Sequence, residues 1–177
     1  QVGLLGHLVF RRTGTDRFGA DAVPPDALWI RVIRSPHARA RFTVGDLGAL
    51  RRRLTAVLTA ADVPFNGFGI YPDIKDQPVL ADGLVRYRGE AVLALVGGRQ
   101  EVLAIRDQDL PIDWVPESPL LGVDAATAPG APLVQADKPR NMLLEGGVLS
   151  GDPSKAFAAC AAVAEGTFET AFVEHGY

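Results

Sequence analysis

The chain leaves its first strand at Arg34-Ser35-Pro36-His37-Ala38-Arg39-Ala40-Arg41, a basic corner that fits no ordinary helix or strand pattern. The residues before it, 28–33, predict a strand, because aromatic and β-branched side chains dominate there. At the two-residue period of a strand, Leu28, Ile30 and Val32 share one face. The proline ends this strand, because it has no amide hydrogen for a sheet ladder and biases the preceding residue toward extended backbone. By itself, the corner predicts a solvated turn rich in positive charge.

Length and composition predict a soluble, globular chain. Its 177 residues, 47% of them hydrophobic and 22% charged, are enough for one domain or slightly more. No apolar run approaches the roughly 18 residues that span a bilayer, and residues 1–7 lack the flanks of a signal peptide, so we expect no membrane partner. The single cysteine, Cys160, excludes an internal disulfide and fits a reducing cytoplasm.

Charge is distributed unevenly along the chain. Residues 1–53 carry ten arginines against four aspartates, whereas residues 54–177 carry eight basic and seventeen acidic residues. A basic third is one property of proteins that bind nucleic acid. The aromatic residues near these arginines do not alternate with them as a base-stacking surface requires. We therefore expect no nucleic-acid partner. The alternative, a nucleic-acid-binding domain, would be supported by salt-dependent retention on DNA or RNA.

The middle of the chain alternates short strands and helices. Apolar periodicity predicts helices over 46–53 and 99–109 and strands over 91–96 and 110–115. Short apolar runs lie at 56–58 and 84–87, and a long irregular loop covers 64–78. The thirteen residues between Val96 and Leu110 permit either a helical crossover between parallel strands or an antiparallel return. These elements predict an α/β (α+β) fold with a mixed sheet and short helices.

The last part of the chain predicts a helix and then a strand. Asp152-Pro153 is a strong helix start, and Ala156, Phe157 and Cys160 form its expected buried stripe. Residues 163–173 alternate in the manner of a strand that stops just before Tyr177. Because the chain also begins with glutamine, we expect it to be a segment of a longer polypeptide.

A search for chemical motifs yields no site. The three histidines are His7, His37 and His175, and none has a metal-ligand spacing to another ligand. Residues 67–69, Gly-Phe-Gly, lack the third glycine of a dinucleotide fingerprint. Ser35 lies two residues from His37, but the intervening proline splays the two side chains. We therefore expect no catalytic, cofactor-binding or metal-binding residue in this segment.

Several motifs in a fixed order carry a family resemblance. They are Arg34-Ser35-Pro36-His37-Ala38-Arg39-Ala40, Val57-Leu58-Thr59-Ala60-Ala61-Asp62-Val63-Pro64, Asp76-Gln77-Pro78-Val79-Leu80-Ala81, Val85-Arg86-Tyr87-Arg88-Gly89-Glu90-Ala91-Val92, and Gly151-Asp152 through Glu165-Gly166-Thr167-Phe168 to Glu174-His175. Together they resemble the N-terminal, α/β hammerhead region of the molybdenum-binding large subunit of the xanthine dehydrogenase and aldehyde oxidase family. The chain departs from the family pattern at Arg39, Phe42 and Ala91, which affects the subfamily.

The resemblance implies a division of the chain. It predicts a lead-in over 1–27, the hammerhead domain over 28–116, a connector over 117–150, and over 151–177 the truncated start of a molybdopterin-binding domain with a helix-strand extension. In similar proteins the residues that hold the cofactor, and the catalytic glutamate, lie downstream of the position equivalent to Tyr177.

The resemblance also implies a function for the complete protein. Such enzymes hydroxylate aldehydes or N-heteroaromatic rings with oxygen from water, using a molybdopterin cofactor and passing electrons through iron-sulfur clusters to FAD or another acceptor. The expected partners are the downstream molybdopterin-binding domains, the iron-sulfur and FAD subunits or domains, and a second copy of the full enzyme. The segment itself is then structural and inactive alone, and His37, Arg39 and Arg41 serve packing or domain contacts. A free-standing interaction module is the alternative.

Overall fold

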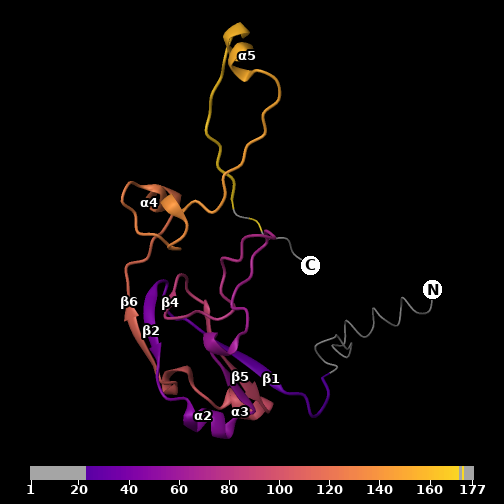
Figure 1. The fold of residues 1–177 in the computed structure, drawn as a ribbon, viewed down its shortest axis with the longest axis vertical. Helices are drawn as coiled ribbons and strands as arrows, with labels where there is room; N and C mark the ends of the chain where they lie inside the picture. Colours follow the sequence, from indigo (N-terminus) through magenta and orange to yellow (C-terminus); the bar gives the residue numbers. More distant parts are fainter. Residues whose placement is uncertain (1–22, 172, 174–177) are drawn as a thin grey trace, which may run out of the picture. The chain divides into compact units, whose positions relative to one another are not determined.

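The computed structural model describes residues 23–171 and 173 (Figure 1). Contacts divide the chain into two compact units, Gln1–Asn141 and Met142–Tyr177, and each is described by itself. Most of the predicted lead-in over 1–27 lies outside the described residues.

The first sheet has three antiparallel strands. β5 (Ala91–Gly97) lies in its centre, between β1 (Trp29–Arg34) and β3 (Ala56–Leu58). β1 pairs with β5 along its whole length, and the register shifts between Ile33 and Arg34, just before the basic corner. The strands predicted over 28–33 and 91–96 are confirmed, and the short apolar run at 56–58 forms β3.

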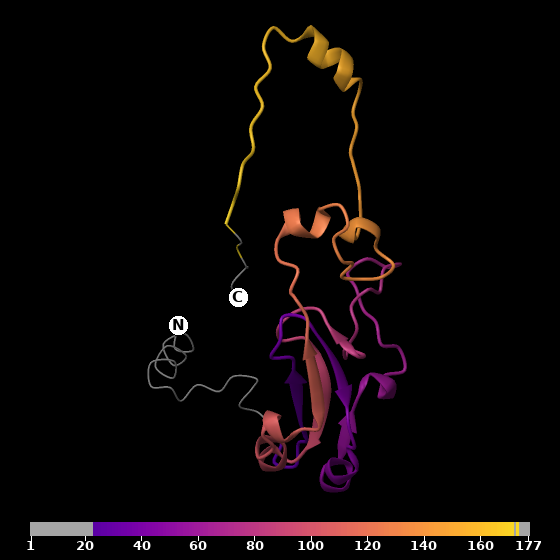
Figure 2. The same cartoon turned by 90° about the vertical axis from the view of Figure 1, so that its left-hand side faces the viewer.

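The second sheet also has three antiparallel strands (Figure 2). β2 (Ala40–Val44) lies between β4 (Leu84–Val85) and β6 (Ile112–Pro116). Of the two connections that the sequence left open after Val96, the parallel crossover does not occur, because β5 and β6 belong to different sheets. All pairings between the named strands are antiparallel, whereas the predicted mixed sheet allowed parallel pairs.

Short helices join these strands. α2 (Gly48–Arg53) confirms the helix predicted near 46–53. α3 (Arg99–Leu103) forms only the first half of the helix predicted over 99–109. Within residues 23–141, the other helical turns are η2 (Ala60–Asp62), η3 (Asp107–Asp109), α4 (Val123–Thr127) and η4 (Pro139–Asn141). α3 is held against β1 by Arg31, whose guanidinium donates to the Val102 carbonyl at 2.9 Å and also to that of Ile105. This cation lies at the C-terminal end of α3, where unpaired carbonyl groups favour positive charge.

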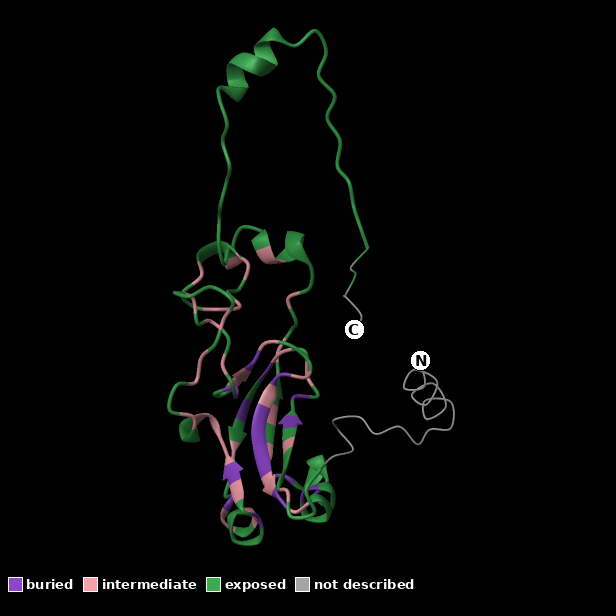
Figure 3. Cartoon of the chain, turned by 90° about the vertical axis from the view of Figure 1, so that its right-hand side faces the viewer, coloured by how far each residue is buried: buried purple, intermediate pink, exposed green. Residues whose placement is uncertain are grey.

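The core is formed by apolar side chains from both sheets and from the segments beside them. Its buried members are Ile33, Ala40, Phe42, Leu47, Leu54, Val57, Ala81, Val85, Val92, Leu93, Leu95, Val102, Ile105 and Leu110. Figure 3 shows the buried positions concentrated in the strands. β5 contributes most because it is central, so it has a neighbouring strand on each side.

The side chains of β1 that are buried are not those of its apolar face in the sequence. Leu28, Ile30 and Val32 are exposed by 56%, 66% and 37%, whereas Ile33 on the opposite face is buried. The physical reason is that α3 packs on the side of Ile33, where Arg31 binds its end. The apolar pattern of β1 therefore located the strand, but it did not identify the side on which the helix packs.

The second unit contains α5 (Pro153–Ala159). Asp152 caps it, because its carboxylate accepts a hydrogen bond from the Lys155 amide at 3.0 Å. The predicted buried stripe of α5 is wrong, since Ala156, Phe157 and Cys160 are exposed and the described residues contain nothing that packs on them.

The strand predicted over 163–173 does not form among residues 163–171 and 173, which are extended and exposed (Figure 3). A strand needs a neighbour to satisfy its amide and carbonyl groups, and the described part of the chain provides none for this segment. Within the described residues, no helix is long and apolar enough to cross a membrane.

Leu93 tests whether β5 organises the core. Replacing it in Leu93→Ala removes a fully buried side chain and leaves a cavity, so the free energy of unfolding should fall by about 2–5 kcal/mol. Val115→Ala, at an exposed position of β6, should change it by less than about 0.5 kcal/mol. Urea unfolding followed by circular dichroism measures both, and equal losses would contradict the assignment of Leu93 to the core.

Candidate functional site

The basic corner joins the two sheets at one point. The chain passes from β1 to β2 through Ser35, and it returns from β4 to β5 through the turn over 86–90. The two crossings are bonded to each other: the Ser35 amide donates to the Glu90 carbonyl, and the Gly89 amide donates to the Ser35 carbonyl, both at 2.9 Å. The Arg34 guanidinium adds a bond to the Gly89 carbonyl at 2.9 Å. Two sequence motifs far apart in the chain therefore form one structural junction.

The returning turn depends on glycine and on a buried carboxylate. Gly89 has a φ of 92°, which side chains other than glycine rarely adopt. The Glu90 carboxylate is buried, and it accepts a hydrogen bond from the Arg86 amide at 2.5 Å and lies 3.5 Å from the Arg86 guanidinium. A buried carboxylate needs such partners, so these contacts keep the turn closed on Ser35.

Ser35 and His37 do not form a nucleophile and base. The buried Ser35 hydroxyl donates to the His37 carbonyl at 2.9 Å and accepts from the His37 amide at 3.0 Å, so it bonds to backbone rather than to imidazole. The His37 ring instead packs edge-on against Trp114 of β6, with the ring centres 5.4 Å apart. Both residues therefore serve to shape the corner.

The two arginines of the corner share one carboxylate. Arg39 and Arg41 lie 2.8 Å and 2.9 Å from the Glu117 carboxylate, which follows β6. The Arg39 side chain is 13% exposed, whereas that of Arg41 is 67% exposed. The hydrogen bond from Arg39, with the positive charges of Arg41 and Arg39, holds the pKa of Glu117 below its ordinary value of 4.5. Arg39 thus contributes to the fold of its own unit, and Arg41 is largely accessible to a partner.

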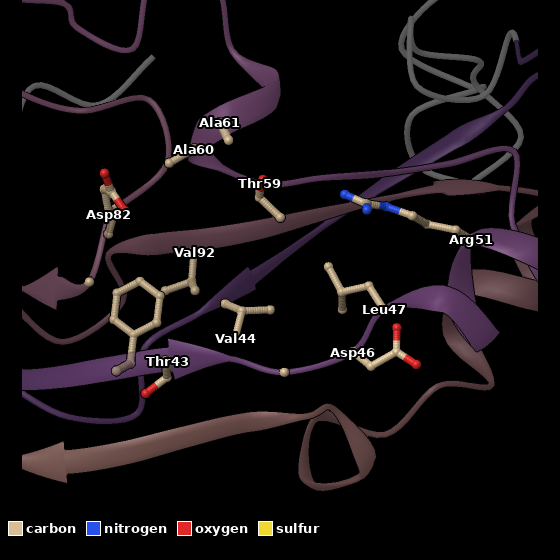
Figure 4. A pocket seen from close by; sticks show the side chains of 14 residues that line it. Thr43, Val44, Asp46, Leu47, Arg51, Thr59, Ala60, Ala61, Asp82 and Val92 are labelled. Carbon is tan, nitrogen blue, oxygen red and sulfur yellow. The ribbon is translucent and has the colours of Figure 1, made fainter.

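A pocket of about 520 Å³ opens beside β2. In the view of Figure 4, Arg51 and Asp82 lie at opposite ends, with Val44 and Val92 between them. Arg51 lies 3.5 Å from Asp62, whose carboxylate accepts bonds from the Thr59 amide and hydroxyl at 2.8 Å. These bonds, the amide bond first, lower the pKa of Asp62. The ionised groups at this end therefore have partners within the chain, and the pocket presents no nucleophile and base pair.

Among residues 23–171 and 173, no three side chains of histidine, cysteine, aspartate or glutamate are grouped to hold a metal ion. Of the three histidines of the chain, His37 is described, while His7 and His175 lie outside the described residues. No reaction step is assigned to the described residues.

A surface that the sequence motifs did not indicate lies on the first sheet. The residues on this face are Leu28, Ile30 and Val32, which are exposed, Ala56, Leu58 and Val96, which are half-buried, and Ala94, which is buried. The available signal was that β5 is apolar at each of positions 91–96, on both of its faces.

Residues 13–110 match the family model described as aldehyde oxidase and xanthine dehydrogenase, a/b hammerhead domain. The chain belongs to this family. The matched residues include the first sheet, β2 and β4 of the second sheet, and the junction between the sheets, and the resemblance drawn from the motifs is confirmed.

Two relatives match almost the whole chain. A probable xanthine dehydrogenase subunit of Bacillus subtilis is 30% identical over 168 residues, or 93% of this chain and 22% of its own length. The nicotinate dehydrogenase large molybdopterin subunit of Eubacterium barkeri is 30% identical over 165 residues, or 92% of this chain and 38% of its own length. The chain therefore spans well under half of either relative.

Solved structures show the same fold. The aldehyde oxidoreductase of Desulfovibrio gigas superposes with a TM-score of 0.61 at 21% identity, over 74% of this chain and 16% of that one. A CO dehydrogenase from Oligotropha carboxidovorans superposes with a TM-score of 0.58 at 27% identity, over 70% and 16%. The predicted α/β hammerhead class is confirmed.

The Glu117 carboxyl should make hammerhead stability depend on pH. Its pKa is lowered in the folded state, so the stabilisation is complete above its ordinary value of 4.5 and is lost as pH falls through the lower folded value. Urea midpoints of wild type and Glu117→Gln should differ at about pH 7 and converge near pH 3. Asp113→Asn is the control, since Asp113 lies on β6, the strand just before Glu117, and forms no ion pair with the described residues. A pH-independent gap for Glu117→Gln would contradict the assignment.

The two arginines should separate in a stability measurement. Arg39→Ala should lower the urea midpoint more than Arg41→Ala, because the less exposed arginine is the less screened by water. Lys replacements at the same positions serve as matched controls that retain the charge. Equal shifts for the two Ala variants would show that exposure does not distinguish the roles of the two arginines.

Proposed function

We propose that this chain is the structural N-terminal part of the large, molybdopterin-binding subunit of a molybdenum hydroxylase. The observation that carries the proposal is the pair of relatives, which match 93% and 92% of the chain while the chain spans only 22% and 38% of them. One of these relatives is named a large molybdopterin subunit. The remaining length of such a subunit is available for cofactor binding and catalysis.

The role of the segment in this proposal is to pack against the rest of the enzyme. The segment contributes no catalytic, cofactor-binding or metal-binding residue; these are supplied by downstream domains, and electrons leave through iron-sulfur and FAD partners. The proposed division is a lead-in over 1–27, the hammerhead over 28–116, a connector over 117–150 and the start of a molybdopterin-binding domain over 151–177. The exposed, extended residues 163–171 support the last assignment, because an isolated strand-like segment needs a partner to pair with. One cysteine and no disulfide pair support a cytoplasmic location.

Metal and pterin analysis tests this proposal. The purified 177-residue chain should contain no stoichiometric molybdenum or pterin, whereas the assembled enzyme that includes it should contain both. Inductively coupled plasma mass spectrometry measures the metal, and fluorescence of the oxidised pterin measures the cofactor. The control is the 177-residue chain produced beside active molybdenum enzymes in the same cells. Stoichiometric molybdenum in the chain alone, or its absence from the assembled protein, would overturn the proposal.

A further inference from the structure

The outer face of the first sheet is apolar, and it is most exposed along β1, since Ala94 at its centre is buried. Side chains alternate along a strand, so residues paired across neighbouring strands point to the same side. The register aligns Ile30 with Val96 and Val96 with Ala56 in one row. A second row aligns Val32 with Ala94 and Ala94 with Leu58, and Leu28 precedes the first strand on the same side. All of these side chains are apolar.

This face lacks the properties of a face that is in contact with water. An antiparallel sheet with one face in solvent normally alternates apolar and polar residues, and the outer face carries no charged or polar side chain in either row. Leu28 and Ile30 are more than half exposed in the described structure. A contiguous exposed apolar surface marks an interaction site or an aggregation hazard.

The opposite face of the same sheet is covered by a helix of the chain. There α3 packs on Ile33, and Arg31 binds the carbonyls at the end of that helix. The Arg99 guanidinium lies 5.1 Å above the centre of the Trp29 ring. Within the first unit, Leu28 and Ile30 stay more than half exposed, so residues 23–141 leave the β1 side of the outer face uncovered.

The length of the relatives identifies the source of that cover. Because the chain spans 22% and 38% of them, most of each relative lies outside the matched segment. A covalently tethered surface has an effective concentration of about millimolar, far above that of a second free copy. An apolar surface of the same large subunit is therefore favoured over self-association.

We propose that the outer face of the first sheet, centred on Ile30 and Val32, is the surface through which the hammerhead docks onto the rest of the molybdopterin-binding subunit. The partner is an apolar surface of that subunit, formed by residues outside this chain. This inference rests on the proposed function and adds to it the surface that makes the contact. The contact is apolar and depends on shape and buried area rather than on charge.

Cysteine labelling in the assembled enzyme tests the inference. Ile30→Cys and Val32→Cys are made separately, and Val115→Cys is the matched control, because Val115 is an exposed apolar residue of a strand in the other sheet. Each variant is treated with a maleimide as the 177-residue chain and within the assembled enzyme, and peptide mass spectrometry reads the labelling rate. Ile30→Cys and Val32→Cys should react at least about tenfold more slowly in the assembled enzyme, while Val115→Cys changes by less than about twofold.

The labelling rates distinguish the segments or molecules that could cover the outer face. Equal rates for Ile30→Cys in the two states would overturn the inference, even if the assembled enzyme contains molybdenum. Protection in the 177-residue chain that rises with its concentration would assign the face to a second copy. Protection that is independent of concentration and is lost when residues 1–22 are deleted would assign it to that segment. Either result overturns the inference, whereas an assembled protein without molybdenum overturns the proposed function instead.

Discussion

The fold depends on the backbone pairing between Ser35 and the turn at Gly89 and Glu90. The chain passes from the first sheet to the second at Ser35 and returns at Gly89 and Glu90. Two backbone hydrogen bonds of 2.9 Å join these two segments to each other. Where the chain crosses from one sheet to the other, its backbone leaves the hydrogen-bonded strands. The amide and carbonyl groups of the crossing segments therefore need other partners. Pairing the crossings satisfies these groups and fixes the register of β1 on β5 together with the entry to β2.

The side chains at the junction reinforce the backbone pairing. Ser35 closes the corner by bonding to the His37 backbone, and His37 packs on Trp114 of the second sheet. Arg39 then reaches Glu117 at the end of the same strand. The basic corner, whose sequence suggests a reactive or charged site, therefore forms a set of contacts that hold the two sheets together.

The two faces of the first sheet connect the fold to the proposed function. One face is covered by the short helix α3, and the other is apolar, with Leu28 and Ile30 exposed within the first unit. A domain that exists alone would carry polar residues on such a face. The imbalance accords with a domain that is one part of a much longer subunit, as the relatives are.

The sequence by itself determined the elements and the family, because periodicity is local and the motifs at residues 34–40 and 85–92 are contiguous. It located β1, α2, the start of α3 and the Asp152 cap to within a few residues. Only the tertiary structure decided which face of β1 is covered, that β5 and β6 belong to separate sheets, and that Cys160 is exposed. The reason is that an apolar strand face indicates burial but does not say which element buries it. That element is decided by contacts between residues far apart in the chain.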